Sequence, residues 1–527
     1  MRERFNDGLR VLIGLWFWLL SFPLEWLHRR RVRGFVASQA ALRARYGIED
    51  TTPIRAFESG VAEDIDRARS RLGAGAIDVF TSGSTRSRKR LLYSKARLRM
   101  VVFSFNDAFA RVFPAFGVRR VSLWLVAPPA DDGSLTSLLV REKRVPPWPV
   151  WLQAPYRAQV HPAVQETSER FGATATRAVM LTVTNPGVLY ATNPSTLALF
   201  FGDVTREWER VRDLARACVQ KRAPLAAILG RLSSAGAWVR LQRIAASSAP
   251  LPPSEWLPGM EAVICWDGGY VRPYLDRLWH VLDPRRVRHI PMYSMSTETL
   301  ETIPTVVREP DGTTSIAFLP IAPGVLYEFI EEGKSDLPEH LLPPTGLEPG
   351  RNYAMVVSDA YGLRRYQTED LFECVRRVSD LPDLRFVRRR NLSFSFTGEK
   401  LTGEQLALAL QAAAEAVPEV ASSGFLSCFP SAGENELPHY KLVLATRSGE
   451  CPAAHLGDRL RDAVEAELCE LNSEFRAKRE TRRLGQLQFV TLSLEEFVRR
   501  AGGDAEARSW DGQFKVLPLY PRLWEST

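Results

Sequence analysis

The chain has 527 residues, of which 45% are hydrophobic and 25% charged, so its composition is that of a globular protein with room for about two to four domains. This composition excludes a disordered chain, a collagen-like chain and a multi-span membrane protein. The 69 Lys and Arg residues exceed the 61 Asp and Glu residues, giving a formal net charge of +8. Spread over this length, that excess is weak evidence for a nucleic-acid, membrane or phosphate partner.

The N-terminal segment 1–31 is predicted to form a helix. Residues 11–24 carry no charge, but this run is shorter than the about 20 apolar residues that a spanning helix needs. It continues into Arg29-Arg30-Arg31 rather than into the small-residue cleavage site of a secretory signal. We expect the helix to pack on its own domain. The alternative is peripheral membrane contact through residues 11–31, with Trp as anchor and the arginines on anionic headgroups.

Strand-like apolar runs alternate with helical stretches through the middle of the chain. The predicted strands are 121–127, 179–184, 262–266, 316–320, 325–330 and 353–358. The predicted helices are 196–218 and 225–246. This interleaving indicates α/β layers.

The last ~140 residues have a different pattern of predicted helices and strands. Thr402 to Gln405 has the capping-box pattern that opens a helix, here over residues 404–416. The other predicted elements are strands at 424–429, 440–446 and 487–492 and a helix at 456–476. We therefore predict three parts: the N-terminal helix 1–31, a large domain 32–384, and a small α+β domain 385–527 with residues 385–391 as a candidate hinge.

The six cysteines are too far apart for a CxxC pair, and several lie in apolar runs. They are typical of buried thiols in a reducing compartment, so we expect a cytoplasmic protein. Membrane association is the alternative that residues 11–31 leave open. The seven histidines form no HxH or HExxH motif, and no zinc site built from protein ligands is expected.

A polar and basic segment follows the strand-like residues 77–80. It comprises Thr81, Ser82, Gly83, Ser84, Thr85, Arg86, Ser87, Arg88, Lys89 and Arg90. Small residues let backbone N–H groups approach a phosphate, hydroxyls donate to its oxygens, and cations neutralise its charge. The GxxxxGK[ST] pattern of a Walker loop is absent. Taken alone, the segment fits a triphosphate-binding loop and a solvated polar turn equally well.

This segment resembles the phosphate-binding loop of the adenylate-forming superfamily, and an ordered series of motifs resembles one of its branches. That branch is the auxin-responsive acyl-acid-amido synthetase family with its bacterial relatives. The motifs are Cys265-Trp266-Asp267-Gly268-Gly269, Tyr293-Ser294-Met295-Ser296-Thr297-Glu298, Leu326-Tyr327-Glu328-Phe329, Tyr361 to Asp370, Phe386 to Arg389, Phe394 to Lys400, Asn472 with Arg479, and Gly512-Gln513-Phe514-Lys515. Their order and approximate spacing hold from about residue 75 to the C-terminus, which is more specific than any single motif.

The resemblance implies an α/β fold, in which a large adenylate-forming N-terminal domain of layered sheets and helices carries a small mobile α+β C-terminal domain. It also implies a ligase that uses ATP and Mg²⁺ to activate a carboxylic acid as an acyl adenylate. The acyl group would then pass to an amine or amino acid, forming an amide. The implied partners are these substrates and no nucleic acid, and a monomer is expected.

Roles for particular residues follow from the same resemblance. Glu298 would bind Mg²⁺, and Thr297 would bond a phosphate or acyl oxygen. Asp370 would accept both ribose hydroxyls, Arg389 would contact ribose or phosphate, and Lys515 would reach the carboxylate and α-phosphate. Further ATP contacts are implied for Thr81, Ser82, Gly83, Ser84, Thr85, Lys89 or Arg90, Gly268, Gly269, Tyr293 and Ser296. Acyl contacts are implied for Trp266 and Tyr327.

Each assignment has a simpler structural alternative. Glu298 could cap a helix from residue 299, Asp370 could be a turn acid before a strand at 371–375, and Lys515 could be a solvated charge. Tyr327 could be a core residue.

The chain also departs from the family pattern. The loop 81–90 lacks a second glycine, and Glu369 and Arg388 stand where the family has glycines. A Cβ there can forbid a backbone with positive φ or crowd a ligand. Two other functions therefore stay open: acyl transfer to the thiol of coenzyme A or of a carrier protein, and a non-catalytic relative that binds a nucleotide or an acyl ligand.

Overall fold

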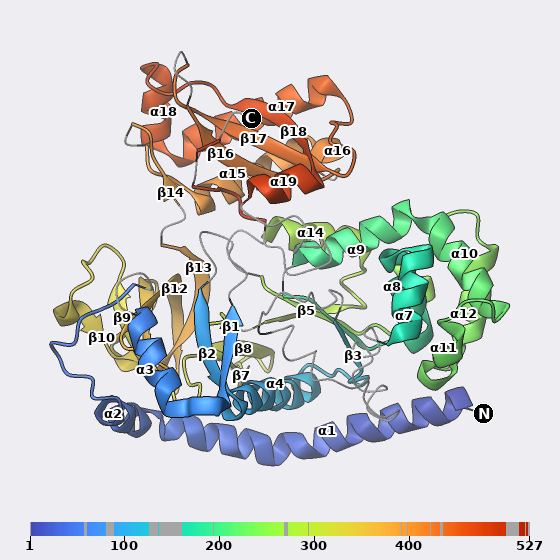
Figure 1. Ribbon diagram of the computed structural model, residues 1–527, viewed down its shortest axis with the longest axis horizontal. Helices are drawn as coiled ribbons and strands as arrows, with labels where there is room; N and C mark the ends of the chain where they lie inside the picture. Colours follow the sequence, from blue (N-terminus) through green and yellow to red (C-terminus); the bar gives the residue numbers. More distant parts are fainter. Residues whose placement is uncertain are drawn as a thin grey trace.

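The protein is described here from a computed structural model, in which a large N-terminal part lies below a small C-terminal domain (Figure 1). The described residues are 2–56, 61–80, 89–125, 135, 161–192, 194–267, 272–292, 295–390, 393–397, 399–421, 423–432, 436–501, 516–521 and 523–524.

A four-stranded parallel sheet with helices forms one half of the large part. Its strands, in the order in which they pair, are β3 (Leu123–Leu125), β4 (Val188–Tyr190), β5 (Ala262–Cys265) and β6 (Arg288–Pro291). Its helices are α7 (Pro162–Phe171), α8 (Ala173–Thr184), α9 (Pro194–Arg206), α10 (Trp208–Val219), α11 (Ala226–Leu232), α12 (Ala237–Ala246), α13 (Pro253–Trp256) and α14 (Arg272–Val281). Parallel pairing requires crossover connections, so the predicted interleaving of strands and helices is confirmed for this half.

The strand predicted at 179–184 is wrong, because these residues complete helix α8. Residues 174–184 are all buried, so the segment has no polar face to reveal a helical period. A short, mostly apolar run cannot be assigned to helix or strand by periodicity alone. The predicted helix over 196–218 is two helices, α9 and α10, and the one over 225–246 is α11 and α12.

The other half of the large part is built on a five-stranded antiparallel sheet. Its strands, in pairing order, are β10 (Leu341–Leu342), β9 (Leu326–Glu331), β11 (Asn352–Ser358), β12 (Tyr366–Val378) and β13 (Leu381–Arg389). Two hairpins lie beside it, β1 (Ala76–Phe80) with β2 (Arg90–Ser94), and β7 (Ile303–Arg308) with β8 (Thr314–Leu319). Because β13 runs to Arg389, the sheet continues past the domain boundary predicted at residue 385.

Helix α1 (Arg2–Arg33) runs along the bottom of the molecule and is followed by α2 (Phe35–Arg45) (Figure 1). It contacts α4 (Lys95–Ala115) and α11, so the N-terminal helix packs on the large part, as first expected. The remaining helix of this part, α3 (Ala62–Leu72), packs on β2.

The C-terminal domain has its own core around a three-stranded sheet. The strands of this sheet are β16 (Phe425–Ser431), β17 (His439–Thr446) and β18 (Gln488–Ser493), and a separate pair is formed by β14 (Ser393–Phe394) and β15 (Leu401–Thr402). Its helices are α15 (Gly403–Ala416), α16 (Pro418–Ala421), α17 (Ala454–Leu471), α18 (Ser473–Glu480) and α19 (Leu494–Arg500). The capping box at α15 is confirmed, because the Thr402 hydroxyl accepts from the Gln405 N–H and the Gln405 amide oxygen accepts from the Thr402 N–H. The single helix predicted at 456–476 is wrong, since it breaks at Asn472 into α17 and α18.

Candidate active site

The turn at residues 295–300 presents Thr297 and Glu298. Met295 and Leu300 form a bridge across it, and the Ser296 hydroxyl accepts from the Thr299 N–H at 3.3 Å. No helix begins at Thr299, so the alternative that Glu298 caps a helix is wrong. Glu298 is nevertheless buried, which places its carboxylate inside the protein rather than in solvent.

The backbone of this turn is held by Tyr93 at the end of β2 and by Arg97 at the start of α4. The Tyr93 hydroxyl donates to the Thr297 carbonyl at 2.9 Å, and Arg97 Nη2 donates to the Glu298 carbonyl at 2.6 Å. Arg97 is buried, pairs with Asp359 at 3.1 Å, and lies against the faces of two tyrosine rings. The position of Glu298 is therefore fixed by a buried cation that also ties α4 to the end of β11.

Lys89 joins the turn to the five-stranded sheet. Its Nζ donates to the hydroxyl of Tyr366 at 2.9 Å and lies 3.7 Å from Oε1 of Glu298. Arg90, the other basic candidate in this segment, instead pairs with Asp66 of α3. Of the two cations, Lys89 is the one beside Glu298.

Tyr366 lies at the centre of these charges. Burial raises its pKa well above the ordinary value, and the carboxylates of Glu298, Glu369 and Asp370 raise the pKa further, while Arg389 opposes them. The phenol therefore stays protonated. Lys89 contacts both Glu298 and Tyr366, and Tyr366 shares β12 with Asp370, so the turn at Glu298 and the β12–β13 ladder form one site.

Asp370 lies within β12 and not in a turn before a strand, so that alternative is also wrong. It faces Arg389 of β13 in the strand register, and Arg389 Nε donates to Asp370 Oδ1 at 3.3 Å. Asp370 is buried, and its N–H donates to the Thr368 hydroxyl. Two residues singled out from separate motifs are thus brought together by strand pairing.

The two glycine replacements behave differently. Glu369 has a φ of 67°, so this position keeps the left-handed backbone that favours glycine, although its residue carries a Cβ. Its carbonyl accepts from the Arg390 N–H at 2.7 Å. Arg388 lies in the extended backbone of β13, pairs with Glu332 and approaches Glu404 of the C-terminal domain. Only Glu369 therefore has the backbone strain that the sequence suggested.

The two residues assigned to the acyl group differ in their setting. Tyr327 is 1% exposed in the core of the large part, where its hydroxyl donates to the Leu300 carbonyl and accepts from the Ala322 N–H. In this structure Tyr327 is thus a core residue, which is the alternative reading of the motif. Trp266 is half-buried just after the carboxyl end of β5, and its backbone N–H donates to the Thr192 carbonyl.

Several predicted site residues lie outside the described residues. They are Thr81, Ser82, Gly83, Ser84, Thr85, Gly268, Gly269, Tyr293 and Lys515.

The residues that sequence reasoning missed are Tyr93, Arg97 and Asp359. Ser94 is a recognisable helix cap, and its hydroxyl accepts from the Arg97 N–H at 3.1 Å. Nothing in the local pattern distinguishes Arg97 from an exposed helix arginine, because its partners come from residues about 200 to 260 positions away.

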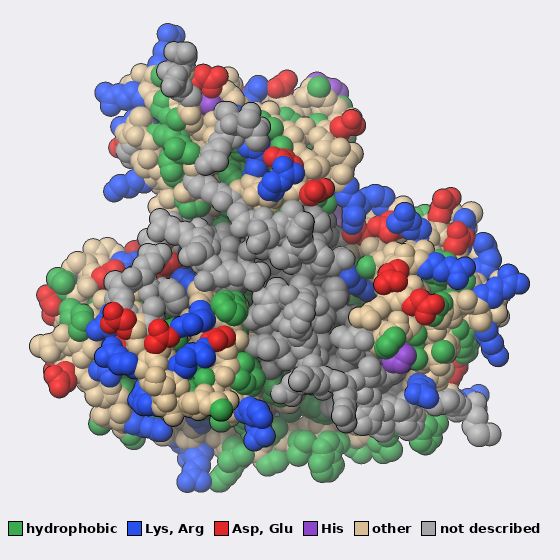
Figure 2. Space-filling model, viewed as in Figure 1, with side chains coloured by type: hydrophobic (Ala, Val, Ile, Leu, Met, Phe, Trp, Pro, Cys, Tyr) green, Lys and Arg blue, Asp and Glu red, His purple; other side chains and the backbone are tan. Residues whose placement is uncertain are grey.

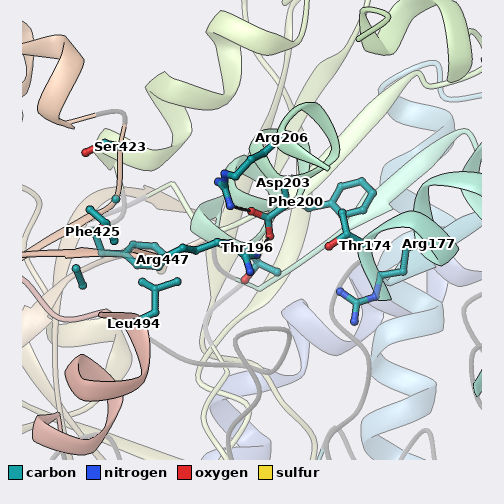
Figure 3. A pocket seen from close by; sticks show the side chains of 13 residues that line it. Thr174, Arg177, Thr196, Phe200, Asp203, Arg206, Ser423, Phe425, Arg447 and Leu494 are labelled. Carbon is teal, nitrogen blue, oxygen red and sulfur yellow. Dashed lines mark hydrogen bonds and ion pairs between the residues drawn. The ribbon is translucent and has the colours of Figure 1, made fainter. Parts of the chain in front are cut away.

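A separate pocket lies between the large part and the C-terminal domain (Figure 3). Thr174, Phe200 and Asp203 line it from α8 and α9, and Phe425 and Arg447 line it from the C-terminal domain. Asp203 pairs with Arg447 across the junction and with Arg206 on its own helix at 2.9 Å. Two of its three arginines, Arg206 and Arg447, pair with its one acid, so this part of the pocket is a contact between the domains.

Two family models match two segments of the chain, one that carries Asp370 and one in the C-terminal domain. Residues 318–389 match the GH3 family central domain, and residues 404–521 match the GH3 family C-terminal domain. The chain contains GH3 family domains. The resemblance to the auxin-responsive acyl-acid-amido synthetases, predicted from motif order, is confirmed. Asp370 and Arg389 both lie in the GH3 central domain.

Similar proteins named as amido or amino acid synthetases are found among curated sequences. The chain is 25% identical over 140 residues to a protein of Oryza sativa subsp. japonica named as an indole-3-acetic acid-amido synthetase, covering 25% of this chain and 29% of that protein. It is 29% identical over 153 residues to the jasmonoyl-L-amino acid synthetase JAR4 of Nicotiana attenuata, covering 28% of this chain and 25% of that protein. These alignments span less than a third of either relative.

Solved structures show the same fold over nearly the whole chain. The structure of the acyl acid amido synthetase AtGH3.15 in complex with 2,4-DB has a TM-score of 0.67 at 12% identity, with 93% of this chain and 91% of that chain covered. A second structure of GH3.15 has the same TM-score at 14% identity, with 94% and 92% covered. The predicted fold class, a large α/β domain with a small α+β C-terminal domain, is confirmed.

Proposed function

We propose that this chain is an ATP-dependent ligase that activates a carboxylic acid as an acyl adenylate and transfers the acyl group to an amine or amino acid. The observation that carries the proposal is the convergence of Lys89, Glu298 and the Asp370–Arg389 pair around Tyr366. The GH3 domains and the ordered motifs support it. We place the reaction in the cytoplasm of a bacterium and expect a monomer.

The cluster suits the first half-reaction. A carboxylate that attacks the α-phosphate of ATP crowds negative charge, so cations held in place supply most of the catalysis. Lys89 would neutralise phosphate charge from a position fixed by Tyr366 and Glu298. Asp370, held by Arg389, would orient the ribose through its hydroxyls.

The residues present also suit Mg²⁺. The described residues include no group of three or more His, Cys, Asp or Glu side chains that could hold a metal. Magnesium is usually bound by one or two carboxylates together with substrate phosphates, and Glu298 would be the protein ligand. Bound there, the ion would neutralise phosphate charge. Lys89, Arg97 and Tyr93 would keep the Glu298 carboxylate and its turn in place.

Other roles in the proposal rest on the family resemblance. ATP contacts would come from Thr81 to Thr85, Gly268, Gly269, Tyr293 and Ser296. Thr297 would bond a phosphate or acyl oxygen, and Trp266 would lie near the acyl group. Lys515 would reach the reacting carboxylate during adenylation. The acids named for the relatives, indole-3-acetic and jasmonic acid, indicate an apolar or aromatic carboxylic acid as substrate.

Pyrophosphate release tests the proposal. Purified protein is incubated with ATP, Mg²⁺ and a panel of acids that includes indole-3-acetic acid, jasmonic acid and 2,4-DB, with and without amino acids. We expect acid-dependent pyrophosphate release and, with an amino acid, the mass of an amide. A thioester with coenzyme A in place of the amide would refute amide formation. ATP binding without turnover of any acid would favour the non-catalytic relative.

The two neighbouring cations provide a matched control. Lys89→Met should slow adenylation about 10²-fold, because one charge that stabilises the transition state is lost. Arg90→Met should keep most of the activity, since Arg90 pairs with Asp66 on α3. Asp370→Ala should weaken ATP binding. Equal rates in both lysine and arginine variants would contradict the assignment.

A further inference from the structure

Helix α1 exposes large apolar side chains and buries several polar ones, although Phe17 and Val32 on it pack against the core. Its inward face carries buried polar residues, Asn6 at 0%, Arg10 at 7% and His28 at 1% exposure. Its outward face carries large apolar side chains that are about half exposed or more. They are Phe5, Val11, Leu12, Leu15, Trp16, Trp18, Leu19, Phe22, Trp26 and Leu27. A helix on a water-facing surface has the opposite arrangement.

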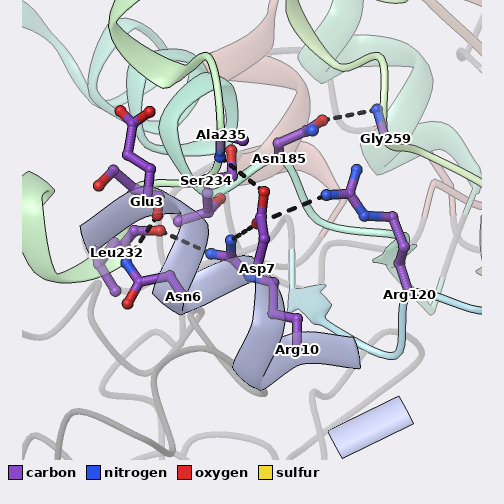
Figure 4. Close-up of polar contacts among 12 residues, drawn as sticks. Glu3, Asn6, Asp7, Arg10, Arg120, Asn185, Leu232, Ser234, Ala235 and Gly259 are labelled. Carbon is purple, nitrogen blue, oxygen red and sulfur yellow. Dashed lines mark hydrogen bonds and ion pairs between the residues drawn. The ribbon is translucent and has the colours of Figure 1, made fainter. Parts of the chain in front are cut away.

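Polar contacts on the inward face fix the rotation of α1 about its axis (Figure 4). Near its start, Asn6 Nδ2 donates to the Ser233 carbonyl and Arg10 Nη2 donates to the Leu232 carbonyl, both at 2.8 Å. Asp7 accepts from the Ala235 N–H at 2.9 Å. Near its end, the His28 ring hydrogen-bonds the Thr305 hydroxyl at 2.9 Å. The helix cannot turn its apolar face inward without breaking these bonds.

The exposed apolar side chains form one continuous stripe. Their spacing of three or four residues places them on one side of the helix. From Val11 to Leu27 the stripe is about 24 Å long at the rise of an α-helix. Figure 2 shows hydrophobic side chains gathered along the lower edge of the molecule, where α1 lies in Figure 1. A soluble protein rarely leaves an apolar stripe of this extent without a partner.

Positive charge lies at both ends of the stripe. Arg4 is exposed before it, and Arg29, Arg30 and Arg33 are exposed after it. Arg29 pairs with Glu25 at 3.0 Å, and the Arg30 guanidinium lies 5.9 Å from the centre of the Trp26 ring. Tryptophan and arginine beside each other at the edge of an apolar surface are typical of a membrane interface.

We propose that α1 docks the protein on an anionic lipid bilayer, lying in the plane of the membrane with its apolar stripe among the acyl chains. Such helices bury their apolar face about 5–10 Å deep and place their cations on the headgroups. The occupant is lipid rather than a second copy of the chain, because pairing two α1 helices in either direction would bring like-charged arginines together at their ends. The inward hydrogen bonds also separate this arrangement from a spanning helix, although α1 is long and apolar enough to cross a membrane.

Docking through α1 leaves the C-terminal domain free to move relative to the large part. The C-terminal domain lies on the opposite side of the molecule from α1 (Figure 1). A bilayer at the lower face would therefore not block that domain, and membrane contact would bring the large part to a surface where apolar acids concentrate.

Flotation of the full-length protein with vesicles tests the proposal. We expect binding to phosphatidylcholine vesicles that contain phosphatidylglycerol and much weaker binding to phosphatidylcholine alone. Leu19→Glu should lower the partition coefficient at least about tenfold, because burying one leucine side chain is worth about that factor. The double change Arg30→Gln with Arg33→Gln should lower the partition coefficient about fivefold for each charge removed, and only with anionic vesicles.

Leu408→Glu is the matched control, since Leu408 is 47% exposed on α15 of the C-terminal domain, on the opposite side of the molecule from α1. It should bind vesicles like the unchanged protein, and unchanged thermal unfolding of Leu19→Glu would show that its fold is kept. Wild-type binding by Leu19→Glu would overturn the proposal. So would a concentration-dependent dimer that Leu19→Glu converts to a monomer without any vesicle binding. Protein that only detergent removes from the vesicles would indicate a spanning helix and overturn the in-plane arrangement.

Discussion

Glu369 is a single residue at which the chain departs from the family pattern but keeps the left-handed backbone conformation that favours glycine. Its left-handed conformation costs an L-residue roughly 1–2 kcal/mol compared with glycine. The strain is held by the β12–β13 pairing and by the bond from the Arg390 N–H to the Glu369 carbonyl. The side chain also adds negative charge near Tyr366, within the proposed nucleotide site.

Glu369→Gly should therefore stabilise the protein. The relief of strain exceeds the extra backbone entropy of glycine in the unfolded chain, so we expect a gain of about 1 kcal/mol. Urea unfolding of the full chain measures this gain. Glu369→Ala is the control, because it removes the same charge but keeps the Cβ; a gain of equal size in both variants would attribute the effect to charge instead of backbone.

His28 is a buried histidine that stays neutral. Burial, together with the positive charges of Arg111, Arg31 and Arg29, lowers its pKa from 6.5 to about 2. The unfolded chain binds a proton at this residue below pH 6.5, whereas the folded chain does not. The contribution of His28 to stability is therefore fully present above pH 6.5 and falls by about 1.4 kcal/mol per pH unit below it.

His28→Gln should flatten this pH dependence, since glutamine can still bond the Thr305 hydroxyl but does not titrate. The measurement is the urea midpoint of unfolding between pH 7.5 and pH 5. His280→Gln, at an exposed position on α14, should leave the slope unchanged. If the His28 variant kept the slope of the unchanged protein, the assignment of this proton to His28 would be wrong.

At the scale of elements, the residue at the break between α17 and α18 connects these helices to the rest of the C-terminal domain. Asn472 lies at the break, where its amide oxygen accepts from the Phe475 N–H at 2.9 Å and caps α18. Its amide N–H group donates to the Glu399 carbonyl at 2.9 Å and to Gln405 Oε1 at 3.0 Å. One side chain thus ties two helices to the start of α15.

Asn472→Ala should destabilise the C-terminal domain by about 1–3 kcal/mol, because a helix cap and two buried hydrogen bonds are lost. Hydrogen exchange of α15 and α18 measures the local loss. Asn472→Asp keeps the cap oxygen but cannot donate, so it should protect α18 while weakening the contact with Glu399. Equal exchange in both variants would show that the cap contributes little.

At the scale of the whole molecule, few polar contacts cross between the large part and the C-terminal domain in the described residues. Asp203 pairs with Arg447, Asp276 accepts from Gln411 at 3.2 Å, and Glu404 lies 3.8 Å from Arg388. A junction with few polar contacts favours relative motion of the domains. The strands β13 and β14 flank the connection between them.

Arg447→Glu should shift the domains toward more open arrangements, because Asp203 would then face a like charge instead of a partner. Small-angle X-ray scattering should show a larger radius of gyration at low salt, with little change at high salt, where the repulsion is screened. Arg459→Glu, at an exposed position on α17, is the control for the change of charge. An unchanged scattering curve for Arg447→Glu would mean that this ion pair does not hold the domains together.

The sequence by itself determined the α/β class, the α15 capping box and the resemblance to the GH3 proteins, because helix caps, amphipathic periods and motif order are local signals. It also predicted Asp370 and Arg389 as residues of one site, although only on the strength of the resemblance. It failed at residues 179–184, where burial on every side removed the polar positions that mark a helix, and at Asn472, where contacts with Glu399 and Gln405 break a helix whose local pattern is continuous.

Only the tertiary structure decided which side chains meet. It placed Lys89 rather than Arg90 beside Glu298, supplied Arg97 from α4 to hold the turn, and buried Tyr327 in the core. It also decided which face of α1 points outward: the sequence contains both the polar and the apolar residues of that helix, but the partners of Asn6, Arg10 and His28 lie more than 200 residues away. Contacts between residues so far apart in the chain have no local signature, since they depend on how the sheets and helices pack.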